Sequence, residues 1–150
     1  MAKISTKSDL FRERKEIIAD VTFALNTQQL HFAAKRAVID QAIWVWSEYE
    51  GKYSPTLFWS PKARTAKRKG LPIIHEHPVP RQVVRDKLFE LKNPTAVKVA
   101  KVFRSYCLGA VIAKSEDECL NKNGLRSKMP PDWDGRDVWA RYRAIGINAP

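Results

Sequence analysis

The sequence contains little cysteine, little glycine and no long apolar run. Its two cysteines, Cys107 and Cys119, lie outside any Cys-x-x-Cys pair, which argues against a zinc knuckle and for ordinary buried thiols. Its six glycines form neither a phosphate-binding loop nor a dinucleotide fingerprint. No apolar stretch approaches about 20 residues, the length of a helix that crosses a membrane. We therefore expect neither a nucleotide-binding enzyme nor a membrane protein.

The first nine residues also lack the apolar segment of a secretory signal, because lysine and polar residues interrupt them. No isolated basic amphipathic tail is present, so a membrane surface is not the partner that we expect. These observations predict a cytoplasmic protein.

Acidic residues are scarce relative to basic ones. The chain has 27 Lys and Arg against 16 Asp and Glu, which gives a net charge of +11. That charge exceeds what solubility requires of a small domain, and it favours a polyanionic partner. Nucleic acid, either DNA or RNA, is the partner that we expect.

Length and apolar content predict a single domain. The chain has 150 residues, of which 44% are hydrophobic, and its five Trp can help to form a core. We expect an α+β fold that is mainly α-helical, with a small two-stranded sheet. Residues 1–50 would form a helical hairpin, residues 51–70 a basic connection, and residues 71–150 the minor sheet with further helices.

Apolar residues at helical spacing predict the hairpin helices at 9–25 and 30–49 and two later helices at 81–91 and 95–107. Ser60-Pro61 is a favourable helix start and predicts a short helix that ends at Gly70. Two further helices are expected, one from Ser115 to Asn123-Gly124 and one at 134–146. Two short apolar runs, 71–74 and 110–113, are the expected strands.

Five basic residues lie between positions 60 and 70, with no acid among them. Phosphate contact is a natural use for them, and the alternative is a solvated helix face. A second basic group recurs at i, i+3 and i+6 on the 95–107 helix and could extend the same surface. The expected nucleic-acid contacts are therefore Lys62, Arg64, Lys67, Arg68, Lys69, Lys98, Lys101 and Arg104, together with Arg81.

The segment from His75 to Pro80, His-Glu-His-Pro-Val-Pro, follows an expected strand and precedes an expected helix. In an extended strand His75 and His77 face one side and Glu76 faces the other. Imidazole can bind a transition metal or act as a general base near neutral pH. The alternative is structural: Glu76 and His77 join the strand end to the helix, and the prolines stiffen the turn.

An acidic segment, residues 115–118, follows the second expected strand in the same way. If the two strands pair, both segments reach one edge of the sheet, which predicts a mixed histidine and carboxylate site for a divalent metal. The alternative is a capping box, since acids favour a helix start. The candidate metal ligands are His75, Glu76, Glu116, Asp117 and Glu118.

Glu76-His77-x-x-Pro80 resembles the opening motif of the HNH, or His-Me finger, nucleases. The resemblance covers about five residues. It implies that Glu76 helps to hold a metal ion, Mg²⁺, Mn²⁺ or Zn²⁺, and that His77 activates the attacking water. That family also has a downstream Asn and a second His on a helix, whereas no His follows His77 in this chain.

Aromatic residues and arginines alternate in the C-terminal segment from 132 to 143. Such alternation permits base stacking and phosphate contact, and the alternative is that the rings close over the core. We expect Trp46 and Trp139 in the core. Arg141 and Arg143 are expected to be exposed and to contact nucleic acid.

The sequence therefore predicts a nucleic-acid-binding protein, with metal-dependent phosphodiester cleavage by His77 and Glu76 as the specific hypothesis. The alternative is a non-enzymatic module that binds nucleic acid, a protein partner or a second copy of the chain, for example in phage or bacterial defence and counter-defence. Apart from the divalent metal, no cofactor is expected.

Overall fold

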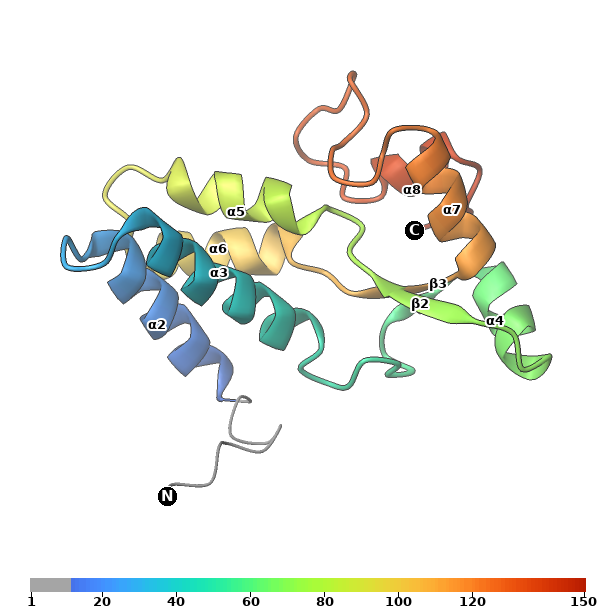
Figure 1. Ribbon diagram of the computed structural model, residues 1–150, viewed down its shortest axis with the longest axis horizontal. Helices are drawn as coiled ribbons and strands as arrows, with labels where there is room; N and C mark the ends of the chain where they lie inside the picture. The colour runs from blue at the N-terminus through green and yellow to red at the C-terminus, as the bar shows by residue number, and fades with distance from the viewer. Residues whose placement is uncertain (1–11) are drawn as a thin grey trace.

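The computed structural model describes residues 12–150, which contain seven helices and one three-stranded sheet. One end of the molecule consists of α2 (Arg14–Asn26), α3 (Phe32–Ser47), α5 (Arg81–Phe89) and α6 (Ala96–Tyr106) (Figure 1). The other end holds the sheet with α4 (Pro61–Arg68), α7 (Lys114–Lys122) and α8 (Ala140–Ala144). The expected α+β, mainly helical class is confirmed.

The helical end has an apolar core. Helices α2 and α3 form the expected hairpin, and α5 and α6 pack against it (Figure 1). Their inward faces bury Val21, Ile43, Leu88 and Phe103 completely, and Trp46 is 7% exposed, as expected. Because these side chains recur at helical spacing, each helix buries one continuous stripe. Part of the expected first helix, residues 9–11, lies outside the described residues.

The sheet has the order β1-β3-β2, with β1 (Phe58–Trp59) parallel and β2 (Ile73–Glu76) antiparallel to the central β3 (Ala110–Ala113). The expectation of two strands was therefore wrong by one. Strand β1 has two residues, too few to show the alternation by which a strand is recognised. Strand β2 also lies two residues later than expected, so that His75 and Glu76 belong to the strand.

The two faces of the sheet are covered by different helices. On one face Ile112 packs with Leu120 of α7 and Tyr142 of α8, and on the other Val111 packs with Ala63 of α4. Strand β3 is buried at all four positions, which explains why its sequence is a continuous apolar run. This arrangement leaves the opposite face of α4 at the surface.

Three helix ends show which local signals were sufficient. Helix α4 begins as expected, since the Ser60 hydroxyl accepts a hydrogen bond from the Ala63 N–H at 3.0 Å. Helix α7 is capped by Glu116, which accepts from the Ala113 N–H at 2.8 Å, and not through Ser115 as expected. Helix α8 is shorter than expected because Asp134 holds a turn, its Oδ1 accepting from two backbone N–H groups.

No helix within residues 12–150 combines the length and the apolar character that a membrane crossing requires.

Candidate functional site

The two histidines of the central motif face the same side, as expected, and their ring centroids are 5.4 Å apart. His75 lies opposite Val111 in the sheet, and its Nδ1 is 2.7 Å from the Lys52 carbonyl oxygen. A carbonyl oxygen only accepts, so His75 Nδ1 carries the proton and donates it. Burial lowers the pKa of His75, which favours this neutral form. His75 therefore fastens the loop after α3 to strand β2.

His77 is positioned by the end of α3. Its Nε2 is 2.8 Å from Ser47 Oγ, and that hydroxyl donates its one hydrogen to the Trp44 carbonyl at 3.0 Å. Ser47 must then accept from His77, so Nε2 is protonated and Nδ1 holds the lone pair. Burial lowers the pKa of His77 to about 3, with smaller contributions from His75 when it is protonated and from the charge of Arg81. His77 is thus neutral near pH 7 and weakly basic.

Glu76 points to the other side of the sheet, where both of its carboxylate oxygens have partners. Oε1 forms an ion pair with Arg141, and Oε2 accepts a hydrogen bond from the Tyr142 hydroxyl at 2.5 Å. Burial raises the pKa of Glu76, while Arg141 and Tyr142 favour its charged form. Strand β2 and helix α8, 65 residues apart, are joined through this carboxylate.

The expectation that Arg141 is exposed was wrong, because its side chain is completely buried. Besides Glu76, its guanidinium donates to the carbonyls of Leu125, Arg126 and His77, at 2.9, 3.1 and 3.2 Å. A buried guanidinium needs such partners, since its desolvation is costly. Arg141 therefore connects three segments of the sheet end and is not available to a phosphate.

The expected acidic ligands do not converge. Glu116 is buried, and it accepts from Ser60 Oγ at 2.5 Å while it caps α7. Glu118 is at the surface, 3.9 Å from Lys114. Only Asp117 lies near the histidine motif. Within residues 12–150 no three His, Cys, Asp or Glu side chains lie close enough to hold a metal ion, and the oxygens of Glu76 already have partners.

A polar cavity of about 470 Å³ lies beside the histidine motif. It is formed where β2 meets the start of α5, the middle of α3 and the segment after α7. Charged side chains of both signs line it, among them Arg36, Asp40, Arg81, Asp117 and Arg126, beside the neutral ring of His77. The cavity brings His77 and Asp117 to one place, together with several guanidinium groups.

Helix α4 and the residue that follows it, Lys69, present a group of five positive charges at the surface. Ala63 and Ala66 are buried against the sheet, and the five basic side chains of residues 62–69 are all exposed. None of the five forms an ion pair with an acid in the described part of the chain. Lys67 lies over the indole of Trp59, 5.0 Å from its centroid.

The other expected basic contacts do not extend this surface. Lys98, Lys101 and Arg104 are on α6 at the helical end, and the ammonium of Lys98 donates to the Lys92 and Asn93 carbonyls. Arg81 is exposed at the rim of the polar cavity. Arg143 is exposed and paired with Asp137 at 2.6 Å. Helix α4 is therefore a separate basic surface.

Trp139 is partly buried against Phe58 and Tyr142, so its ring closes over the sheet end of the molecule.

The chain matches no protein-family model, no curated protein and no solved structure. Its function is therefore inferred from its residues and their geometry.

Sequence reasoning did not single out Ser47, which orients His77, or the aromatic residues beside α4. The signal for the second group was present, because Tyr53 and Trp59 precede the basic run within a few residues. Aromatic residues beside lysines and arginines are typical of surfaces that bind nucleic acid. Nothing in the sequence around Ser47 identifies its partner 30 residues away.

Proposed function

We propose that this protein binds nucleic acid and that helix α4 is its principal contact surface. The observation that carries the proposal is a group of five exposed basic side chains, four on α4 and the fifth on Lys69 directly after it, with no acidic partner among the described residues. Unpaired lysine and arginine side chains on one short helix are suited to neutralising successive phosphates. The net charge of +11 supports the same partner.

The contacts that hold α4 against the sheet also support the proposal. Ser60 caps the helix and is itself held by Glu116 of α7, while Ala63 and Ala66 fix the inner face on the sheet. The charged face is consequently carried by a rigid base. A rigid surface loses little conformational entropy when it binds.

The test is a salt titration of binding with matched charge removals. Neutralising Arg64 and Arg68 together as glutamines should weaken binding to an arbitrary DNA or RNA. It should also flatten the dependence on salt by about 0.9 per lost contact for duplex DNA, or about 0.7 for a single strand. The matched control neutralises Lys101 and Arg104 on α6, where we expect little change.

Equal effects of the two pairs would place the contact elsewhere on the molecule. If the parent protein binds neither DNA nor RNA at low salt, the proposal is wrong, and a module for a protein partner or a second copy of the chain becomes the better interpretation.

Phosphodiester cleavage in the polar cavity is the second candidate, favoured by the convergence of His77, Asp117 and Arg81 on one site. It ranks below binding because a pKa of about 3 makes His77 a weaker base than the optimum near neutral pH. The carboxylate of Glu76 is also already shared between Arg141 and Tyr142.

Cleavage is tested with labelled DNA and RNA strands and Mg²⁺, Mn²⁺ or Zn²⁺. His77→Ala should reduce any activity by about 100-fold or more without weakening binding. A parent protein that cuts no substrate with any ion rules this candidate out.

A further inference from the structure

An open cavity of about 690 Å³ lies between helix α4 and the loop that precedes strand β1. It differs from the polar cavity because, among the described residues, its lining combines apolar rings with positive charges and contains no acid. The lining residues are Tyr53, Pro55, Trp59, Arg64, Lys67 and Arg68.

The aromatic wall of this cavity is held in place by the sheet. The indole Nε1 of Trp59 donates to the Ser54 carbonyl at 3.0 Å, and His75 donates to the Lys52 carbonyl at 2.7 Å. These two bonds fix the backbone on both sides of Tyr53. Tyr53 is nevertheless 41% exposed and therefore accessible to a ligand, and the mobile ammonium of Lys52 lies 5.6 Å from its ring centroid.

The cationic wall is one side of helix α4. Positions 64, 67 and 68 are three and four residues apart, so their side chains share a face, and this face lines the cavity. Lys62 and Lys69 do not line it. The cavity therefore has positive charges along one wall and an exposed phenol ring on the other.

We propose that this cavity receives an unpaired nucleobase of a single-stranded nucleic acid, which stacks on Tyr53 while the cations of α4 hold the neighbouring phosphates. The inference rests on the proposed function and specifies its substrate class. A nucleobase presents a flat π-face beside a phosphate, which matches a ring facing a row of cations. In a duplex the bases are stacked on one another and cannot lie flat on an external ring.

The experiment compares an unpaired strand of about 12 nucleotides, within the range of known single-strand sites, with a duplex of the same length. Tyr53→Ala should weaken binding of the single strand by about 5-fold to 150-fold, the usual loss of one base-stacking contact. Binding of the duplex should hardly change. Tyr53→Phe keeps the ring and should restore the affinity.

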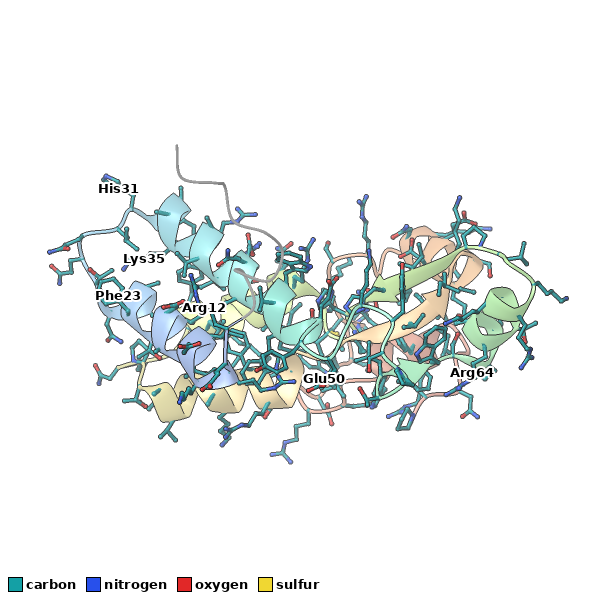
Figure 2. All side chains as sticks on the ribbon, turned by 90° about the horizontal axis from the view of Figure 1, so that it is seen from below. Arg12, Phe23, His31, Lys35, Glu50 and Arg64 are labelled. Atoms are coloured by element: carbon teal, nitrogen blue, oxygen red, sulfur yellow. The ribbon has the colours of Figure 1, made fainter. Side chains whose placement is uncertain are left out.

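Phe23→Ala is the matched control, because Phe23 is also an exposed aromatic residue, 63% accessible, at the end of the molecule opposite Arg64 (Figure 2). A strand that carries 2-aminopurine gives a second readout, since the fluorescence of this base falls when it stacks. Quenching is expected with the parent protein and with Tyr53→Phe, and not with Tyr53→Ala.

The outcomes separate the two proposals. If the parent protein binds strand and duplex equally and Tyr53→Ala changes neither affinity nor quenching, the base-stacking inference is overturned while nucleic-acid binding through α4 stands. If the parent protein binds no nucleic acid, both proposals are overturned.

Discussion

The two ends of the molecule are stabilised in different ways. At the helical end, the buried side chains between α2, α3, α5 and α6 are almost all apolar, and the ion pair Arg85–Asp40 lies at the margin with both side chains partly exposed. At the sheet end, charged groups are inside: Arg141 and Glu116 are buried, and Glu76 lies between Arg141 and Tyr142. The helical end depends on shape and apolar area, whereas the sheet end combines apolar packing with specific polar partners.

This difference matters for function because the candidate surfaces lie at or next to the sheet end. Helix α4 lies beside the sheet (Figure 1), the cavity beside Tyr53 is lined by α4 and Trp59 of β1, and the histidine motif begins in β2. Polar partners with fixed geometry hold such segments more precisely than apolar packing alone does. The buried charges therefore position the surfaces on which the proposals depend.

Breaking the buried ion pair should have the largest effect. Arg141→Met leaves the Glu76 carboxylate without its cation, and we expect the free energy of unfolding to fall by about 3 to 5 kcal/mol. The double variant Arg141→Met with Glu76→Gln should be less destabilised than the single one, because no uncompensated charge remains. Denaturant unfolding followed by circular dichroism measures both.

The control lies at the helical end. Arg85→Met removes the pair with Asp40, whose two side chains are 13% and 37% exposed, and should cost at most about 1 kcal/mol. Equal losses for Arg85→Met and Arg141→Met would contradict the contrast between the two ends.

The contrast also explains how far the fold could be predicted. The four helices of the helical end follow from apolar spacing, and Ser60-Pro61 identified the start of α4, because each signal is local. Strand β1 escaped detection since two residues carry no pattern. It is recognisable only by its pairing with β3.

The candidate site was less predictable. Alternation along the strand correctly separated His75 and His77 from Glu76. The partner of Glu76 lies 65 residues away, and Arg141 reads in sequence as one more surface cation of a basic protein. Arginine is almost never fully buried unless it has a charged or polar partner. The pairing of Arg141 with Glu76 is visible only in the three-dimensional structure.

A second prediction concerns the connection between the two ends of the molecule. This joint is the segment between α6 and β3 that contains Gly109, together with the residues that it contacts, His75 and Ser47. A Cβ atom at this position would lie 2.7 Å from the His75 ring and 2.8 Å from the Ser47 carbonyl oxygen. Gly109→Ala should therefore lower the free energy of unfolding by about 1 to 3 kcal/mol through overpacking.

His75→Ala provides the matched test at the joint. It removes the nearest side chain but leaves the Ser47 carbonyl, so combining it with Gly109→Ala should recover part of the loss. A variant Gly109→Ala that is as stable as the parent protein would show that the two ends can shift relative to each other without cost.

The smallest expected effect is the loss of unfolding free energy in acid that is caused by His77. The pKa of His77 falls from an ordinary value near 6.5 to about 3, chiefly through burial, so the unfolded chain binds this proton at a higher pH than the folded protein does. The stability contributed by the neutral ring is present above about pH 6.5 and is lost as the pH falls towards 3. Between about pH 7 and pH 5.5 the loss of unfolding free energy amounts to about 1 kcal/mol.

The variant His77→Gln tests this expectation. Its side chain stays neutral throughout, so its unfolding free energy should depend less on pH over this interval. If His77→Gln and the parent protein lose stability in parallel, the acid response belongs to another group, with His75 the first to examine because burial lowers its pKa as well.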